Sequence, residues 1–182
     1  ANQRSVEQAE GALKNFIAAA PKDNELKFGL AQLYVTHRQI DKAEATLREI
    51  ESTAEGKTTI VRARTALARM RMGSGDKKAA KELADKVLAE DSANAGALVI
   101  RAQLQLEEGK RDEAIANLRH VLRDHPGHID ALKLISQAHL QGGDLDLASE
   151  NLRLLISGDP KNDEARMMLA RIHMRQRNGD KA

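Results

Sequence analysis

Three histidines lie close together near the middle of the chain, in the stretch HVLRDHPGH at residues 120–128. Imidazole nitrogens bind zinc and similar metals, so this cluster is the first candidate for a metal site. The spacing of His120, His125 and His128 does not place all three on one face of a helix, and Pro126 separates two of them. We therefore predict no metal site. His139 and His173, further along, are interpreted as packing residues.

The remaining residues offer no constellation for catalysis. The chain has no cysteine, which excludes thiol chemistry and disulfides. Acids and bases are scattered over faces expected to be solvated, and no glycine-rich phosphate loop follows a strand. We predict that the protein is not an enzyme and holds no cofactor.

Composition narrows the possible partners. The 182 residues include 29 basic and 27 acidic ones, so the net charge of +2 creates no strong field toward nucleic acid. The chain has few aromatic side chains on which nucleic-acid bases could stack: one tyrosine, two phenylalanines and no tryptophan. No apolar run reaches the length of a membrane span, so we expect no membrane insertion by this segment. A local basic stripe remains possible, formed by Arg62, Arg69, Arg171 and Arg175.

A period of 34 residues organises the chain, as the glycines at 75, 109 and 143 show. We number positions, or slots, within units that start at Asn24, Val61, Ala95, Ile129 and Asp163. Slot 20 then holds alanine throughout: Ala43, Ala80, Ala114, Ala148 and Ala182. Slot 8 is also always small: Ala31, Ala68, Ala102, Ser136 and Ala170. Small residues at these two slots predict a pair of antiparallel helices that approach closely where their axes cross.

Turn residues mark the ends of the predicted helices. All three prolines, Pro21, Pro126 and Pro160, fall in slot 32, where a proline stops the second helix. The glycines of slot 15 can adopt the left-handed conformation that ends a first helix, and Asp76 or Asp144 can cap the helix that follows.

A helix-turn-helix unit of 34 residues with these small residues and this proline resembles the tetratricopeptide repeat. The resemblance implies an all-α, right-handed superhelical solenoid of antiparallel helix pairs. We predict full repeats at 24–60, 61–94, 95–128 and 129–162, a lone second helix at 1–23 and a truncated repeat at 163–182. The 37-residue first repeat carries its extra residues in STAEGKTT. Neither terminal segment has the polar character of a solenoid cap, so we expect a piece of a longer array.

Departures from the family pattern are local. Tryptophan never occupies slot 4, and slot 11 has the usual aromatic residue only at Tyr34. Arg101 stands where leucine is usual, and we expect its aliphatic stem to lie along the groove between helices.

The family resemblance implies that one stripe of each first helix lines a concave groove. Slot 9 of that stripe is polar: Gln32, Arg69, Gln103, Gln137 and Arg171. Slot 12 is apolar: Val35, Met72, Leu106, Leu140 and Met174. Slot 5 adds Phe28, Val99 and Met167, and Arg175 follows in slot 13. Such a surface suits an extended peptide or an amphipathic helix. The alternative is that slot 12 is partly buried by packing and slot 9 is merely solvated.

These patterns predict a non-enzymatic scaffold that binds a protein or peptide segment as part of a larger complex. Slot 9 contains no asparagine, so we do not predict the lysine and asparagine clamp that grips acidic chaperone termini. A periplasmic module that guides an anionic polysaccharide along its arginines is one alternative, and a structural spacer is another. The alanine-rich units are similar in style to bacterial envelope arrays, including those of exopolysaccharide export and exosortase-associated systems, which favours a periplasmic location.

Overall fold

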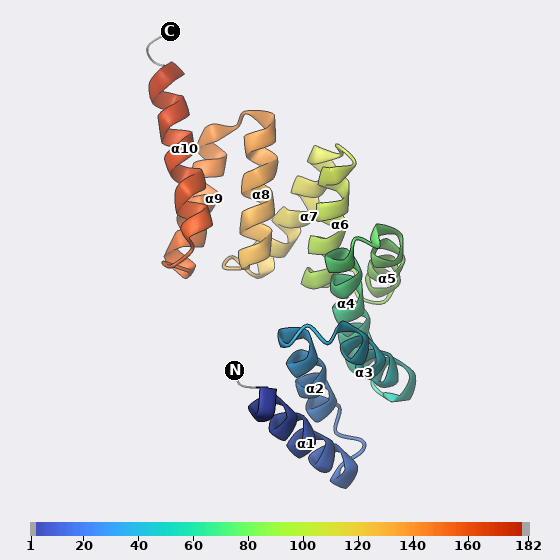
Figure 1. Cartoon of the computed structure of the whole chain (residues 1–182). Helices are drawn as coiled ribbons and strands as arrows, with labels where there is room; N and C mark the ends of the chain where they lie inside the picture. Colours follow the sequence, from blue (N-terminus) through green and yellow to red (C-terminus); the bar gives the residue numbers. More distant parts are fainter. Residues whose placement is uncertain (1–2, 180–182) are drawn as a thin grey trace. The chain divides into compact units, whose positions relative to one another are not determined.

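The computed structural model describes residues 3–179 and contains ten α-helices and no strand within that range (Figure 1). The chain divides into two compact units, residues 1–91 and 92–182. The first unit contains α1 (Gln3–Ala19), α2 (Asn24–Thr36), α3 (Ile40–Thr53), α4 (Lys57–Ser74) and α5 (Lys77–Glu90). The second contains α6 (Ala95–Glu107), α7 (Arg111–Asp124), α8 (Ile129–Gly142), α9 (Leu145–Gly158) and α10 (Asp163–Gly179).

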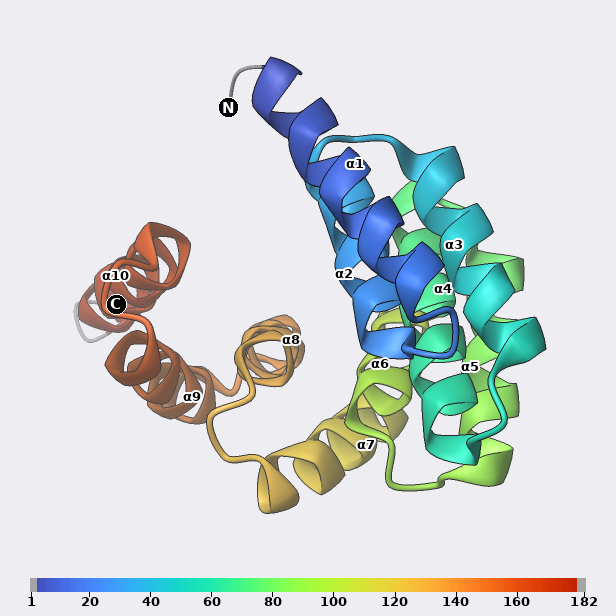
Figure 2. The ribbon, with the colours of Figure 1, turned by 90° about the horizontal axis from the view of Figure 1, so that it is seen from below.

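Successive helices form antiparallel pairs within each unit, as the predicted fold class requires. In the first unit α2 packs against α3 and α4 against α5, and in the second α6 packs against α7 and α8 against α9 (Figure 2). Four of the five first helices begin at the residues that start the units in sequence, namely Asn24, Ala95, Ile129 and Asp163. Helix α4 begins at Lys57, four residues before Val61, so part of the extra sequence lengthens a helix instead of a loop.

The small residues at slots 8 and 20 form the helix crossings. Ala43, Ala80, Ala114 and Ala148 of slot 20 are fully buried, and so are Ala68, Ala102 and Ser136 of slot 8, with Ala31 almost so. The prediction of close crossings is therefore confirmed for the four described pairs. Ala170 of α10 is exposed, and Ala182 lies outside the described residues.

Tight turns join the two helices of each pair. Gly75, Gly109 and Gly143 have φ values of 81°, 76° and 83°, which confirms the left-handed conformation predicted for slot 15. Arg38 occupies the same slot in the first pair and also has a positive φ, 58°. An L side chain is strained in this region, and nothing in the sequence around Arg38 indicates the conformation.

The caps of the second helices differ from the sequence prediction at one position. Asp76 caps α5 by accepting a hydrogen bond from the backbone N–H of Ala79 at 3.1 Å, as predicted. Asp144 precedes α9 but makes no side-chain cap bond. Its carboxylate lies 3.4 Å from Nδ1 of His139 and 3.9 Å from the guanidinium of Arg111. The cap prediction for Asp144 is wrong because these two nitrogens draw its oxygens away from the helix N-terminus.

Each unit has its own hydrophobic core. In the first unit one cluster includes Phe28, Leu47 and Leu67, and another joins Leu30, Tyr34 and Ala43 to Leu13 and Ile17 of α1. In the second unit Leu132, Leu152, Leu155 and Ile172 form a cluster that ties α8, α9 and α10 together. The described prolines each lie two residues beyond the last residue of a second helix, outside these cores.

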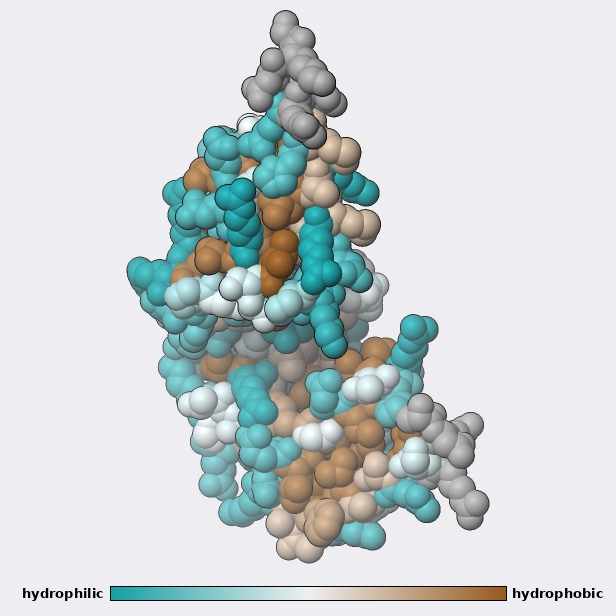
Figure 3. Space-filling model, turned by 90° about the vertical axis from the view of Figure 1, so that its left-hand side faces the viewer, coloured by the Kyte–Doolittle hydropathy of each residue, from teal (hydrophilic) through white to brown (hydrophobic). Residues whose placement is uncertain are grey.

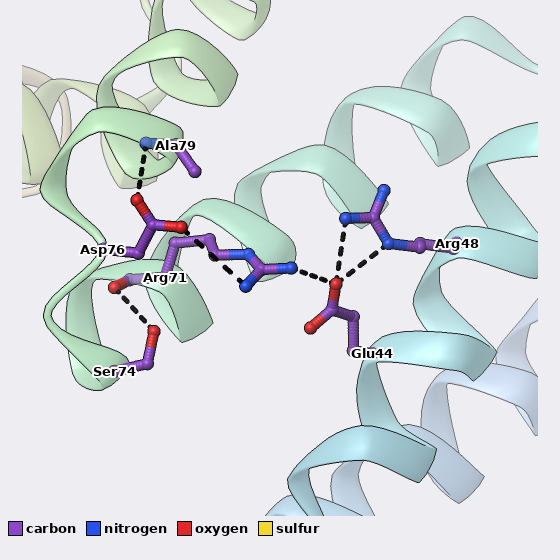
Figure 4. Close-up of polar contacts among 6 residues, drawn as sticks. All are labelled: Glu44, Arg48, Arg71, Ser74, Asp76 and Ala79. Carbon is purple, nitrogen blue, oxygen red and sulfur yellow. Dashed lines mark hydrogen bonds and ion pairs between the residues drawn. The ribbon is translucent and has the colours of Figure 1, made fainter.

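Ion pairs connect successive repeats inside the first unit. Arg71 of α4 contacts Glu44 of α3, and its other guanidinium nitrogen lies 3.9 Å from Asp76 (Figure 4). Arg48 also reaches Glu44, at 2.9 Å. Glu44 thus lies between two arginines, and Arg71 between two carboxylates. This polar chain links α3 to the turn that joins α4 to α5.

Candidate functional site

The candidate site is the stripe of slots 5, 9, 12 and 13 on the first helices, which we call the first-helix face. Each unit is described by itself, with the stripe on α2 and α4 in the first unit and on α6, α8 and α10 in the second. Residues at these slots lie on one side of a helix because they are spaced four, seven and eight residues apart. Figure 3 shows hydrophobic side chains gathered between hydrophilic ones on both units.

In the first unit the predicted residues lie at different depths. Gln32 and Arg69 are exposed, Val35 is 37% exposed and Met72 is half-buried. Phe28 is buried, with a relative exposure of 8%. Its ring lies 4.0 Å beneath the guanidinium of Arg62.

Arg62 is already engaged within the first unit. Besides covering Phe28, its guanidinium contacts the carboxylate of Glu25 on α2. A cation over an aromatic face and beside a carboxylate has much of its charge satisfied locally. Of the arginines predicted to form a basic stripe in this unit, only Arg69 remains without a polar partner among the described residues.

In the second unit the first-helix face becomes more open toward α10. Val99 and Leu106 of α6 are buried, at 7% and 9%, and Gln103 is half-buried. Leu140 of α8 is half-buried against the core cluster, whereas Gln137 is exposed. On α10 the whole stripe reaches solvent: Met167 is 56% and Met174 60% exposed, and Arg171 and Arg175 are exposed as well.

Polar contacts hold α10 against its neighbours. Lys133 of α8 forms an ion pair with Glu164 of α10 at 2.6 Å. Gln176 donates a hydrogen bond to Asp146 of α9 at 2.9 Å. Ala165 and Ile172 of α10 are almost fully buried in the core cluster with residues of α8 and α9. The exposed stripe therefore belongs to a helix that is packed against its neighbours.

A network that the sequence did not predict links α1 to the first repeat. Glu10 of α1 accepts hydrogen bonds from Lys14 at 2.7 Å, from the hydroxyl of Tyr34 at 3.0 Å and from Lys42 at 3.5 Å. The Lys14 hydrogen bond is the main reason that the pKa of the Glu10 carboxyl lies below its usual value. Burial raises the pKa of Tyr34.

Arg101 makes a second unpredicted network, in the interface between α6 and α7. Its guanidinium donates to Asn117 at 3.1 Å, Asn117 donates to Gln105 at 2.7 Å, and Gln105 donates to Glu113 at 2.9 Å. Nε of Arg101 is buried without a hydrogen-bond partner. The arginine is therefore held by an amide chain and has no carboxylate beside it among the described residues.

The histidines have separate local roles. His128 caps α8 by accepting from the backbone N–H of Ala131 at 3.3 Å. Nε2 of His120 lies 3.8 Å from Asp124. His139 is buried in the packing position expected of it, whereas His173 is exposed. Within residues 3–179 no group of three or more metal-binding side chains comes together. No described helix is long and apolar enough to cross a membrane.

Comparison of the sequence with protein families identifies the tetratricopeptide repeat. One profile of this family matches residues 3–69 and 105–156, and a second matches residues 65–127 and 134–182. Each match covers more than half of the chain. Domains of this family typically serve as non-enzymatic scaffolds that bind proteins or peptides. No curated protein matches the sequence.

Solved structures share the fold. One chain in the crystal structure of the APC/C hetero-tetramer Cut9–Hcn1 is similar over 95% of this chain and 34% of its own length, with 11% identity and a TM-score of 0.80. TTC0263, a thermophilic TPR protein of Thermus thermophilus, is similar over 93% of this chain and 91% of its own length, with 19% identity and a TM-score of 0.66. YrrB, described as a TPR protein with an unusual peptide-binding site, is similar over 91% of this chain and 84% of its own length, with 17% identity and a TM-score of 0.58. The chain belongs to the tetratricopeptide repeat family.

Proposed function

We propose that this protein is a scaffold that binds a segment of a partner protein on its first-helix face, chiefly on α8 and α10. One observation carries the proposal. Gln137 of α8 and Arg171 and Arg175 of α10 have no side-chain partner among the described residues, and Met167 and Met174 of α10 are each more than half exposed.

The chemistry of this face suits a polypeptide ligand. Glutamine can donate and accept hydrogen bonds, and arginine presents several donors, so both can pair with polar groups of a bound chain. Methionine is flexible and polarisable, and it adapts to apolar side chains of different shape. A single exposed apolar residue is common on any protein surface. Two methionines separated by two helical turns and flanked by free donors offer a polypeptide segment apolar and polar contacts along one helix.

A similar protein supports this use of the fold. The peptide-binding site of YrrB shows that a solenoid of this architecture can hold a peptide. YrrB is only 17% identical to this chain, so the residues proposed to bind the partner are inferred from the structure of this chain and not from that of YrrB.

The test compares two matched sets of substitutions in the second unit. The face variant replaces Gln137, Met167, Arg171 and Met174 with serine. The control variant replaces Arg119, Leu147, Arg153 and Leu154 with serine, which are also exposed but lie on second helices. Each set removes two apolar and two polar side chains from exposed positions of the same unit, so their general effects on solubility should be alike.

Both variants and the unaltered chain serve as bait for capture of proteins from cell extracts, followed by mass spectrometry. We expect a protein that the unaltered chain and the control variant retain and the face variant loses. Circular dichroism checks that both variants keep their helices. If every captured protein is retained equally by a folded face variant, the first-helix face is not the binding site and a structural spacer becomes the better description.

A further inference from the structure

We infer that His128 is a pH-sensitive cap, which orders the first turn of α8 while its ring is neutral and releases that turn when the ring takes up a proton. Its Nδ1 accepts a hydrogen bond from the backbone N–H of Ala131 at 3.3 Å. A ring nitrogen can accept only while it carries no proton, so the neutral ring holds its single proton on Nε2. This property of α8 requires no ligand.

The equivalent caps of the second unit cannot change in this way. Asn94 accepts from the N–H of Ala97 at 3.1 Å, before α6. Asn162 accepts from the N–H of Ala165 at 3.0 Å, before α10. Both residues occupy slot 34 of their repeats, as His128 does. An amide neither gains nor loses a proton near neutral pH, whereas histidine changes its charge between roughly pH 5 and 8. Of the three first helices in this unit, α8 is therefore the one whose cap a proton can remove.

A proton on Nδ1 acts on the start of α8 in two ways. The nitrogen turns from an acceptor into a donor that faces the N–H of Ala131, so the hydrogen bond is lost. The ring also carries a positive charge at the N-terminus of a helix, where the helix dipole is positive as well. Both effects favour opening of the first turn.

Asp124 and His125 are the ionisable groups that the end of α7 contributes near His128. The carboxylate of Asp124 is held by Arg123 at 2.9 Å, and Nε2 of His120 lies 3.8 Å from it, so much of its charge is already satisfied. The carbonyl of His125 accepts the backbone N–H of His128 at 3.0 Å. A protonated His125 opposes a second positive charge nearby, which moves the loss of the cap to lower pH without preventing it.

Asp130 and Asp159 are the carboxylates that α8 itself and the loop after α9 contribute at this end of the repeat. Asp130 is exposed and has no ion pair among the described residues, so it favours a proton on the ring. Asp159 accepts hydrogen bonds from the backbone N–H of Lys161 at 3.3 Å and from the side chain of Asn162 at 3.2 Å, which engage both of its oxygens. These carboxylates influence the pH at which the ring charges, but the proton still removes the acceptor.

Opening is confined to the start of the helix by the contacts of the next two residues. Leu132 is almost fully buried in the core cluster of the second unit, and Lys133 pairs with Glu164 of α10 at 2.6 Å. Loss of the cap therefore loosens the connection between α7 and α8, which joins two successive repeats, while the rest of α8 stays in place.

The experiment measures amide hydrogen exchange of the unaltered chain by NMR at about pH 7.5 and about pH 5, on either side of the histidine range. Each rate is divided by the intrinsic exchange rate at the same pH. The loss of a side-chain cap changes a local equilibrium by roughly 2- to 30-fold, so we expect the protection of Ala131 and Leu132 to fall about tenfold at the lower pH. The amide of Ala97, capped by Asn94, should keep its protection.

Two variants separate the cap from other effects of acid. His128→Asn introduces the amide cap that α6 and α10 use, so the protection of Ala131 should be the same at both pH values. His128→Ala has no side-chain cap at any pH, so its protection should be low at both. The nitrogen chemical shifts of the His128 ring in the unaltered chain should show the proton on Nε2 at the higher pH.

Several results would overturn the inference. These are unchanged protection of Ala131 and Leu132 between the two pH values, an equal loss in His128→Asn, or an equal loss at Ala97. A neutral ring with its proton on Nδ1 would contradict it too, because that nitrogen could not accept. All of these measurements use the chain alone, so they are independent of whether the capture experiment finds a partner.

Discussion

Ala114 provides a direct test of the helix crossing on which the fold depends. Its side chain is fully buried in the α6–α7 pair, as are those of Ala102 and Leu118. Leucine at position 114 adds three carbon atoms where the packed helices leave no solvent-accessible surface. Such overpacking forces helices apart or side chains off their rotamers and costs about 1–3 kcal/mol.

The expected size of the effect makes the experiment decisive. For a chain of this length each kcal/mol corresponds to about 2–4 °C in Tm, so Ala114→Leu should lower Tm by roughly 2–12 °C. Ala116→Leu is the matched control, because Ala116 lies on the same helix and is exposed. That control should shift Tm by little, since leucine and alanine are both good helix formers.

Hydrogen exchange locates the damage. Repeats in a solenoid contact only their neighbours, so the loss of protection in Ala114→Leu should be greatest in the amides of α6 and α7. The reasoning would be refuted if Ala114→Leu and Ala116→Leu had the same Tm. Equal melting would mean that slot 20 does not set the distance between the two helices.

Three further predictions concern backbone strain at Arg38, the pH dependence of stability through Glu10, and the half-buried Arg101. Arg38→Gly should raise the free energy of unfolding by about 0.5–1 kcal/mol, because it relieves the positive φ at some cost in unfolded-state entropy; the midpoint of urea unfolding measures this. Because Lys14 holds the pKa of folded Glu10 low, that carboxylate should contribute stability above its unfolded pKa and lose it as pH falls through the folded pKa. Glu10→Gln should therefore unfold more easily than the unaltered chain at neutral pH and equally easily near the acid end of a pH series. Replacing Arg101 and Asn117 together with leucine should stabilise the protein by about 1 kcal/mol, because it removes a buried nitrogen that lacks a partner; a lower urea midpoint would contradict this.

The regular parts of the fold could be predicted because the same physical demand recurs in every repeat. Alanine at slot 20 lets the two helices of a pair approach closely. Glycine at slot 15 adopts the positive φ that the turn between them needs. Arg38 shows the limit of this reasoning. The chain reverses there in the same conformation, but arginine does not by itself indicate a left-handed residue.

The depth of the candidate site could not be predicted from helical periodicity. Periodicity places Phe28, Val99 and Leu106 on the same stripe as Met167 and Met174, but the first three are buried and the last two are exposed. Exposure depends on side chains from other helices, such as Arg62 over Phe28, and these are distant in the sequence. The guanidinium of Arg101 was likewise missed, because its hydrogen bond to Asn117 requires both helices to be in place.

Helix α10 contains two kinds of residue, those that pack in the core and those that reach solvent. Ala165 and Ile172 are buried and hold the helix in place, while Met167, Arg171 and Met174 reach solvent between and beyond them. Neighbouring residues such as Arg171 and Ile172 thus differ in how much the stability of the fold depends on them. Substitutions at the exposed positions should therefore change the surface of α10 with little effect on folding. The chemistry of the exposed side chains can thus vary while the packing of the repeat stays the same.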